Sequence, residues 1–300
     1  MPRAKKRDAG DGCDAALPDE AALAAFRAKV REQGRELYRD LPWRRTRDPY
    51  EIWISEVMLQ QTQVSRVDGR WQRWLMRFGT VEELASADAA DVLDEWQGLG
   101  YNRRALAVHR AAQAVAEAGG EFPRDAKALV ALPGIGPATA AGIRAFAFDL
   151  HGVYLETNVR TVALHELFAG REGVADREIM SVVEATCPPD GGFAADSEDD
   201  PRSWYYAMLD YGAYLKRTVP NPSRRSSAHS RQSRFEGSRR QKRAALVRAL
   251  LANREGAGED ALVAAVVAEG VELDRALAHE LLAELAAEGF CRQAGSLWLP

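Results

Sequence analysis

Residues 132–140 read LPGIGPATA, and this stretch decides the fold. It lies between DAKALVAL at 125–132 and TAAGIRAFAF at 139–148, two segments whose apolar residues recur three and four positions apart, as on a helix face. Gly134 and Gly136 permit a turn with positive φ that brings backbone N–H groups against a large ligand. Two helices joined in this way can hold a DNA phosphate without reading sequence. The alternative is an ordinary turn with glycines at a helix end.

Helical patterning continues through most of the chain. Hydrophobic residues make up 46% of the sequence, and runs of Ala, Leu, Glu and Arg with helical spacing recur from end to end. Short units closed by Gly or Pro extend from residue 19 to residue 149, a less regular stretch follows at 168–202, and the helical pattern resumes at 204–217. The sequence therefore predicts an all-α fold of short helices joined by tight turns, with little sheet.

Charge is segregated along the sequence although the total is close to neutral. The formal net charge is −4, from 40 Lys and Arg against 44 Asp and Glu. Residues 214–243 hold ten Lys and Arg against the single acid Glu236, whereas residues 255–300 hold nine acids against two arginines. The total charge thus averages a cationic segment, which suits a polyanionic partner, with an acidic C-terminal segment.

Residues 236–300 form a separate predicted unit. Their pattern predicts helices at 239–252, 258–268 and 273–288, and the closing FCRQAGSLWLP at 290–300 can form a short β-wing. That outline is winged-helix-like, but its third helix is acidic. Contact with a protein, or with the basic segment of the same chain, therefore stays open beside the reading of a DNA groove.

Composition excludes several classes of protein. Cys13, Cys187 and Cys291 lie too far apart for a C-x-x-C metal clip or a disulfide-rich scaffold. No apolar run reaches the roughly 18 residues of a membrane span. Residues 1–18 carry a basic cluster without apolar periodicity and are expected to form a flexible tail. We expect a monomer that acts in the cytoplasm, with the chromosome and without a membrane.

Four motifs in register carry a family resemblance. They are LPWRRTRDPYEIWISEVMLQQTQV at 41–64, GLGYNRRA at 98–105, LPGIGPATA at 132–140 and ETNVRTV at 156–162. Together they resemble the helix-hairpin-helix-GPD superfamily of DNA glycosylases, and SEVMLQQTQV resembles MutY-type A/G-specific adenine DNA glycosylases more than endonuclease III. The resemblance covers about 21–235. It implies a six-helix barrel at 43–149, a second lobe from 21–42 plus 150–235, and DNA in the cleft between them.

The resemblance implies roles for two carboxylates. Glu56 is expected to protonate the flipped adenine and then to handle the attacking water, because a purine anion is a poor leaving group. Glu156 stands where the family has an aspartate that compensates the charge of an oxocarbenium-like sugar. Since glutamate is one methylene longer, Glu156 either still reaches the sugar or serves only as an acid at a helix start. We favour the catalytic role.

Further residues are expected to bind DNA or the flipped base. By resemblance Gln61 fills the stack after base extrusion, Tyr101 is the wedge at the opposite base, and Trp43 and Arg44 line the adenine pocket. For Trp43, Leu59 and Tyr101 the alternative is ordinary core packing. The complete expected set is Trp43, Arg44, Leu59, Gln61, Tyr101, Gly134, Gly136, Asn158, Arg224 and Arg225.

Two family features are expected to be missing. Ala138 occupies the position at which bifunctional members carry the Schiff-base lysine, so we predict a monofunctional enzyme that leaves the strand intact. The four cysteines that hold a [4Fe–4S] cluster in most relatives fall on Lys216, Ser223, Ser226 and Gln232, so no cofactor is expected. The substituted segment carries Arg224, Arg225, Arg231 and Arg234, which we expect to contact the DNA backbone.

The leading hypothesis is an enzyme of base excision repair that hydrolyses the N-glycosidic bond of adenine mispaired with guanine or 8-oxoguanine. Residues 236–300 are too short and too helical for the β-rich domain with which many relatives check for 8-oxoguanine, so the partner base stays open. One alternative is a thymine or uracil glycosylase for G·T or G·U mismatches. Another is a non-catalytic protein that binds DNA mismatches or lesions.

Overall fold

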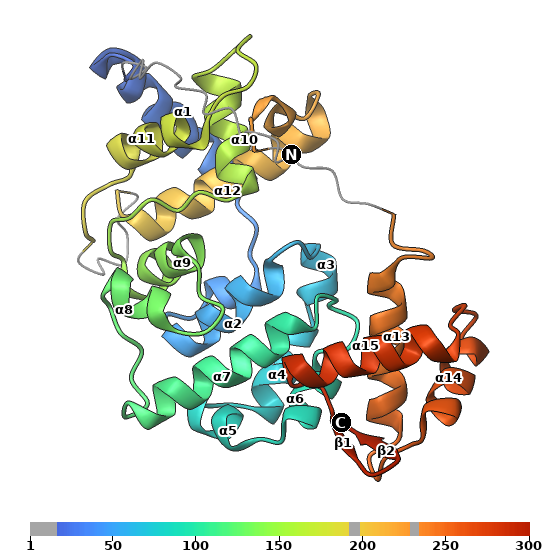
Figure 1. Ribbon diagram of the computed structural model, residues 1–300. Helices are drawn as coiled ribbons and strands as arrows, with labels where there is room; N and C mark the ends of the chain where they lie inside the picture. The colour runs from blue at the N-terminus through green and yellow to red at the C-terminus, as the bar shows by residue number, and fades with distance from the viewer. Residues whose placement is uncertain (1–16, 192–198, 229–233) are drawn as a thin grey trace, which may run out of the picture. The chain divides into compact units, whose positions relative to one another are not determined.

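The computed structural model describes residues 17–191, 199–228 and 234–300. Residues 1–16 of the predicted tail, and Arg231 and Gln232 of the predicted basic segment, lie outside these ranges. Almost all regular structure is helical, with one two-stranded hairpin near the C-terminus (Figure 1). The predicted all-α fold class is therefore confirmed. None of the helices in the described ranges combines the length and the apolar character needed to cross a lipid bilayer.

The helices follow one another closely along the chain. They are α1 (Glu20–Leu37), α2 (Pro49–Leu59), α3 (Val64–Val67), α4 (Arg70–Arg77), α5 (Val81–Ser86), α6 (Ala89–Glu95), α7 (Arg103–Glu117), α8 (Ala126–Ala131), α9 (Pro137–Phe148), α10 (Thr157–Glu166), α11 (Asp176–Thr186), α12 (Pro201–Thr218), α13 (Arg239–Ala252), α14 (Glu259–Ala268) and α15 (Arg275–Glu288). Two 3-10 turns, η1 (Pro42–Arg44) and η2 (Pro222–Arg225), and the strands β1 (Arg292–Ala294) and β2 (Leu297–Leu299) complete the structure.

The chain divides into two compact units. The first comprises Met1–Tyr38, Leu155–Cys187 and Tyr206–His229, and the second comprises Arg39–Tyr154, Pro188–Tyr205 and Ser230–Pro300. This division differs from the one expected from the sequence at several boundaries, and two of the differences involve long segments. Residues 188–205 join the unit of the barrel rather than the second lobe, and residues 236–300 are grouped with the barrel instead of standing alone.

Helix α2 is the central helix of the second unit. Asp48 caps its start, because its carboxylate accepts hydrogen bonds from the N–H groups of Tyr50 at 2.8 Å and Glu51 at 3.3 Å. From there almost every side chain is buried, including Trp53 and Ile54, which are at most 1% exposed. A helix that is apolar on nearly all sides must be surrounded by other helices. Helix α2 packs mainly against α9 and also contacts α4 and α7.

Helices α8 and α9 form the predicted helix-hairpin-helix. Gly134 has φ +75°, and a Cβ on it would lie 2.6 Å from Cβ of Ala107 in α7, so only glycine fits there. Gly136 differs from the expectation, because its φ is −85° and it precedes α9 in an extended conformation. A Cβ at Gly136 would meet no atom within 4 Å. The space beside the first turn of α9 is therefore open to an incoming group.

The first unit brings two helices unusually close together. A Cβ on Gly212 of α12 would lie 2.3 Å from the backbone oxygen of Asn158 in α10, so a larger residue would force the two helices apart. Helix α11 also belongs to this unit, although the sequence pattern indicated a less regular stretch there. Short helices with few apolar repeats give weak periodicity, which explains the difference.

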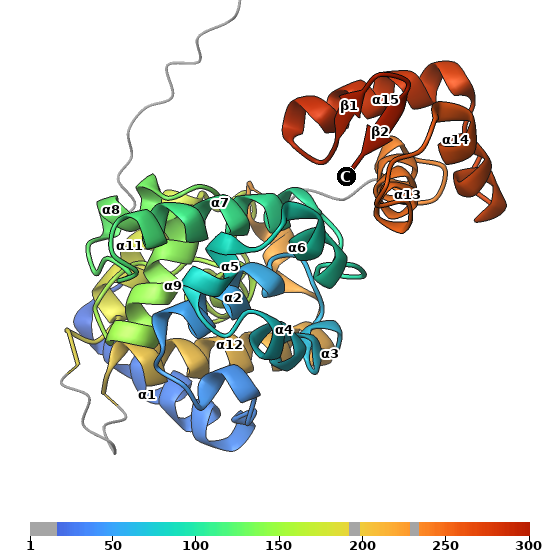
Figure 2. The ribbon, with the colours of Figure 1, turned by 90° about the horizontal axis from the view of Figure 1, so that it is seen from below.

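The C-terminal residues confirm the predicted winged-helix-like pattern. Helices α13, α14 and α15 coincide with the three expected helices to within two residues at each end, and the last eleven residues contain the expected hairpin. Arg292 pairs with Leu299, and Ala294 pairs with Leu297, in antiparallel register. Figure 2 shows the three helices and the hairpin gathered into one group.

Candidate functional site

Glu56 lies on α2 with its carboxylate held by a tyrosine. The hydroxyl of Tyr154 donates a hydrogen bond to Oε2 of Glu56 at 2.9 Å. Gly142 of α9 makes room for both side chains, because a Cβ there would lie 2.4 Å from Oε2 of Glu56 and 3.0 Å from the ring of Tyr154. As expected from its apolar neighbours, Glu56 is partly buried rather than fully exposed. The arrangement fixes one oxygen of the Glu56 carboxylate.

Tyr154 is itself fixed by aromatic contacts. Its ring meets Phe146 and Tyr205 edge-on, with ring centroids 5.3 Å apart in each pair. Its backbone N–H donates to the hydroxyl of Tyr205 at 3.1 Å, and that hydroxyl donates to the backbone oxygen of Gly152. Tyr154 is therefore a rigid support for Glu56.

Glu156 caps helix α10. Its Oε1 accepts hydrogen bonds from the backbone N–H groups of Asn158 and Val159, the latter at 3.0 Å. Burial raises the pKa of Glu156, whereas the nearby Lys216 ammonium and the two N–H groups lower it. Glu156 thus acts as an acid at a helix start, which was one of the two roles expected for it. Its other oxygen, Oε2, accepts a hydrogen bond from the Asn158 side-chain amide at 3.4 Å. Capping and catalysis are compatible, because one oxygen serves each.

Gln61 and Tyr101 both sit in strained turns. Their φ angles are +54° and +50°, a region that residues with a Cβ adopt rarely and that clusters at functional sites. Tyr101 is 41% exposed and Gln61 is exposed. Exposed side chains on fixed, strained turns suit residues that enter a base stack. Their predicted roles stay predictions.

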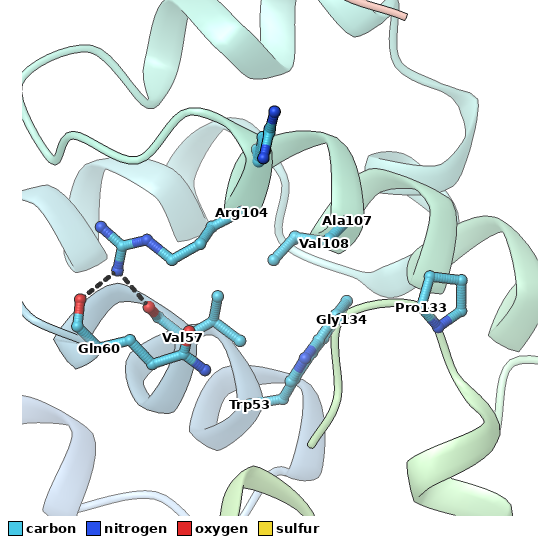
Figure 3. A pocket seen from close by; sticks show the side chains of 9 residues that line it. Trp53, Val57, Gln60, Arg104, Ala107, Val108, Pro133 and Gly134 are labelled. Carbon is cyan, nitrogen blue, oxygen red and sulfur yellow. Dashed lines mark hydrogen bonds between the residues drawn. The ribbon is translucent and has the colours of Figure 1, made fainter. Parts of the chain in front are cut away.

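Arg104 on α7 ties the two turns together. One of its terminal nitrogens donates to the backbone oxygens of Val57 and Gln60 at 2.7 Å, at the end of α2 (Figure 3). The same nitrogen also donates to that of Met58 at 3.2 Å. The other donates to the Thr62 hydroxyl and to the oxygens of Leu99 and Gly100 at 3.0 to 3.1 Å. Burial lowers the pKa of Arg104 to about 10, so the guanidinium is still charged at neutral pH. It holds the turn of Gln61 and the turn of Tyr101 in one place.

A small cavity of about 150 Å³ lies beside the hairpin turn. Figure 3 shows that α2, α7 and the turn contribute its lining. Trp53 and Val57 come from α2, Ala107 comes from α7, and Pro133 and Gly134 come from the turn. The lining is mostly apolar, and the cavity is too small for a nucleobase with its sugar.

Trp43 and Arg44 lie in the core more than at a surface. Trp43 is 4% exposed and meets Trp71 edge-on, with ring centroids 6.2 Å apart. Arg44 is 6% exposed and donates to the backbone oxygen of Arg39 at 3.0 Å. Trp43 therefore packs in the core, as the alternative interpretation of the sequence predicted. Leu59, at the last position of α2, is partly exposed, and its contact with a base stays a prediction.

Of the four arginines expected to bind the DNA backbone, Arg231 lies outside the described residues and Arg234 is exposed and paired with Glu236. The other two behave differently from each other. Arg224 is exposed, as such a role requires. Arg225 is directed inward, because its guanidinium donates to the backbone oxygen of Phe168 at 2.7 Å and to that of Leu164. It satisfies carbonyls at the end of α10, which is a structural role. A phosphate would have to compete with these hydrogen bonds.

The residues at the family's cluster positions do not fit an iron–sulfur cluster. Lys216 is an ammonium that donates to Oδ1 of Asn158 at 2.8 Å. The hydroxyls of Ser223 and Ser226 donate to Asn221 at 2.8 Å and to Asp176 at 3.3 Å. Gln232 lies outside the described residues. Iron–sulfur clusters are held by thiolates, and none of the three described side chains offers one.

The sequence matches a family model of DNA-repair proteins over the segment that contains both candidate carboxylates. Residues 54–195 match the family described as HhH-GPD superfamily base excision DNA repair protein. They contain Glu56, the hairpin, Tyr154 and Glu156. The resemblance predicted from the four motifs is therefore confirmed for this segment.

The chain is also similar to adenine DNA glycosylases. It is 41% identical to the adenine DNA glycosylase of Mycolicibacterium smegmatis over 154 residues, which cover 51% of this chain and 53% of that protein. It is 39% identical to the adenine DNA glycosylase of Homo sapiens over 154 residues, which cover 48% of this chain and 28% of that protein. The aligned part thus spans about half the length of the bacterial relative and less of the human one.

Solved structures share the fold. A thermostable thymine-DNA glycosylase matches with a TM-score of 0.55 and 23% identity, covering 64% of this chain and 87% of that one. A non-covalent endonuclease III–DNA complex matches with a TM-score of 0.56 and 20% identity, covering 68% of this chain and 91% of that one. At such identities the likeness establishes the glycosylase fold and no more.

Sequence reasoning missed four residues that shape the site: Tyr154, Gly142, Arg104 and Lys216. Arg104 lies inside the GLGYNRRA motif, but its acceptors come from segments more than 40 positions away as well as from its own turn. Gly142 lacks the turn signals that mark a functional glycine. Only Lys216 had a signal, since a lysine near the end of an apolar helix replaced an expected cysteine.

Replacing Gly142 with alanine is expected to displace the Glu56 carboxylate without unfolding the protein. The added methyl would overlap the far end of a flexible side chain, which can move, and alanine favours a helix. We expect a melting temperature within a few degrees of the wild type and loss of the hydrogen bond between Tyr154 and Glu56 in a crystal structure. Gly152→Ala is the control, because its Cβ would meet only Ala141 at 3.9 Å. An intact hydrogen bond in Gly142→Ala would contradict this geometry.

Replacing Arg104 with methionine is expected to destabilise the protein by about 3 kcal/mol or more, because several buried acceptors lose their donor. Arg104→Lys should recover little, since an ammonium has three donors and no planar fork. Arg103→Met is the matched control. The side chain of Arg103 is 74% exposed and pairs with Glu288, so its loss should cost under about 1 kcal/mol. Urea unfolding measures all three, and similar midpoints for both methionine variants would contradict the role of Arg104.

Proposed function

We propose that this protein hydrolyses the N-glycosidic bond of adenine in double-stranded DNA where adenine is mispaired with guanine or 8-oxoguanine. The observation that carries the proposal is Glu56, whose carboxylate is held by Tyr154 at 2.9 Å in the space that Gly142 leaves. It lies in the segment that matches the HhH-GPD family model, in a chain that is similar to adenine DNA glycosylases. Base excision repair would then proceed from the abasic site.

In the proposed reaction Glu56 is the general acid. Its carboxyl proton passes to a ring nitrogen of the flipped adenine while the bond between C1′ and the base breaks, and the bonding electrons leave with the base. Water then attacks C1′ and returns a proton to Glu56, which restores the acid. The hydrogen bond from the Tyr154 hydroxyl keeps the carboxyl group from rotating, so the proton stays directed at the base during the reaction.

Glu156 is the proposed electrostatic partner of the sugar. An ionised carboxylate stabilises the positive charge that develops on the deoxyribose ring as the base departs. The backbone N–H groups of Asn158 and Val159 hold Oε1, and Oε2, which accepts from the Asn158 side-chain amide at 3.4 Å, is the oxygen proposed to face the sugar.

The hairpin is the proposed anchor for the DNA backbone. The first N–H groups of α9 have no acceptors within the helix, and the position of Gly136 is open, so a phosphate can approach them. Exposed Arg224 is a second proposed phosphate contact. Such contacts position the enzyme and leave the choice of base to the pocket beside Glu56.

Base release identifies the substrate and the reaction type together. Duplexes containing G·A, 8-oxoG·A, G·T or G·U, each with a labelled target base, should release adenine only, and the strand should stay intact until alkali is added, because Ala138 cannot form a Schiff base. Glu56→Gln and Glu156→Gln should each bind DNA but release adenine about 10²-fold more slowly or worse. Glu117→Gln, at the exposed end of α7, is the control.

Three results would overturn parts of this proposal. Release of thymine or uracil would make the protein a mismatch glycosylase of another specificity. Tight mismatch binding without release would make it a binding protein. Strand nicking that borohydride traps covalently would contradict the monofunctional mechanism.

We also propose that the protein works without an iron–sulfur cluster, since Lys216, Ser223 and Ser226 supply no thiolate. Iron analysis of freshly purified protein should find less than about one-tenth of an iron atom per chain, with no absorption band near about 400 nm. The same preparation should release adenine at full rate without added iron. Stoichiometric iron with that absorption band would contradict the proposal.

A further inference from the structure

Two residues of α12 stand one helical turn apart and meet the start of α10. Gly212 permits backbone contact, since a Cβ there would lie 2.3 Å from the backbone oxygen of Asn158. Lys216 follows four positions later, on the same face of the helix. Its ammonium donates to Oδ1 of Asn158 at 2.8 Å. The close approach at Gly212 therefore brings a cation to the residue beside the Glu156 cap.

Asn158 connects this cation to the carboxylate. Its side-chain oxygen accepts from Lys216, and its side-chain nitrogen donates to Oε2 of Glu156 at 3.4 Å. The ammonium thereby determines which way the amide faces, because only the oxygen end can accept its hydrogen bond. The amide nitrogen is then directed at Glu156.

The pKa values of Lys216 and Glu156 depend on each other. Burial lowers the pKa of Lys216, and the neighbouring Glu156 raises it again. Burial raises the pKa of Glu156, and Lys216 is the strongest influence that lowers it. Burial is the larger effect on both, so the pKa of Glu156 is raised and that of Lys216 is lowered overall, and each group opposes part of the other's shift.

Other charged groups around Glu156 contribute less. Arg160 on α10 also lowers the pKa of Glu156, but its guanidinium is paired with both carboxylate oxygens of Asp176 on α11, at 3.0 and 2.8 Å. Arg225 of η2 donates to backbone oxygens at the far end of α10. Among the described residues of this unit, Lys216 is therefore the main cation acting on Glu156.

We propose that Lys216 is a positioning residue that keeps Glu156 ionised and oriented through Asn158. This inference rests on the proposed function, in which an ionised Glu156 stabilises the sugar cation. Lys216 stands at a position where cluster-bearing members of the family have a cysteine. In this chain Lys216 acts on the Glu156 carboxylate through its charge and through its hydrogen bond to Asn158.

The test compares three variants by two measurements. Lys216→Met removes charge and hydrogen bond, Lys216→Gln keeps a donor for Asn158 without the charge, and Lys216→Arg keeps the charge. The first measurement is the pH dependence of single-turnover adenine release. The second is the pKa of Glu156 in the DNA-free protein, from carboxyl-labelled glutamate by NMR, with the resonance assigned by Glu156→Gln.

Loss of the charge is expected to raise the pKa of Glu156 by about one unit, which lowers the ionised fraction about tenfold on the acid side. Because the ionised form is the active one, the acid limb of the rate profile should move to higher pH by the same amount in Lys216→Met and Lys216→Gln. The alkaline limb, binding of an uncleavable duplex, and Lys216→Arg should change little. Lys29→Met is the matched control, because Lys29 pairs with Glu32 on the exposed face of α1.

The outcomes separate this inference from the proposed function. An unmoved acid limb together with an unchanged pKa of Glu156 in Lys216→Gln would overturn the inference, and so would an equal change in Lys29→Met. If the wild type releases no base but the pKa of Glu156 still rises in the charge-removing variants, the pairing stands and the proposed function fails. If Lys216→Met does not fold, Lys216→Gln decides, since it keeps the hydrogen bond.

Discussion

The site depends above all on the hydrogen bonds that the Arg104 guanidinium makes around the end of α2. A helix leaves its last carbonyls without partners inside the helix, and burial makes that costly. Arg104 donates to two of them and to the carbonyl of the following residue, Gln60, and it reaches Leu99 and Gly100 with its other nitrogen. The same cation thus ends the helix that carries Glu56 and fixes the turns that present Gln61 and Tyr101.

Glycines then set the distances at both carboxylates. Gly142 lets Glu56 and Tyr154 meet against α9, and Gly212 lets α12 touch α10 beside Glu156. In each case the missing methyl belongs to a helix rather than to a loop, so the glycine costs helix stability and provides close approach in exchange. Leu155 alone separates Tyr154 from Glu156 in the sequence, so one short segment contributes to both carboxylate environments.

The sequence predicted the local features well and the side-chain partnerships poorly. The hairpin, the helical class, the three C-terminal helices and the partial burial of Glu56 all follow from spacing, apolar patterns and turn residues, which are local. The contact of Tyr154 with Glu56 joins residues 98 positions apart, and that of Lys216 with Asn158 joins residues 58 apart. Such pairs depend on helix packing, which no local pattern records. For the same reason Arg225 reads as a free cation in the sequence, although it caps α10 in the structure.

A crystal structure of the protein with a duplex that carries a non-hydrolysable adenine nucleoside opposite guanine tests the central claim most directly. We expect the adenine to be extruded from the stack, with a ring nitrogen about 3 Å from the Glu56 carboxyl group and the Tyr154 hydrogen bond intact. An adenine that stays stacked in the duplex, or that is extruded but binds away from Glu56, would contradict the account.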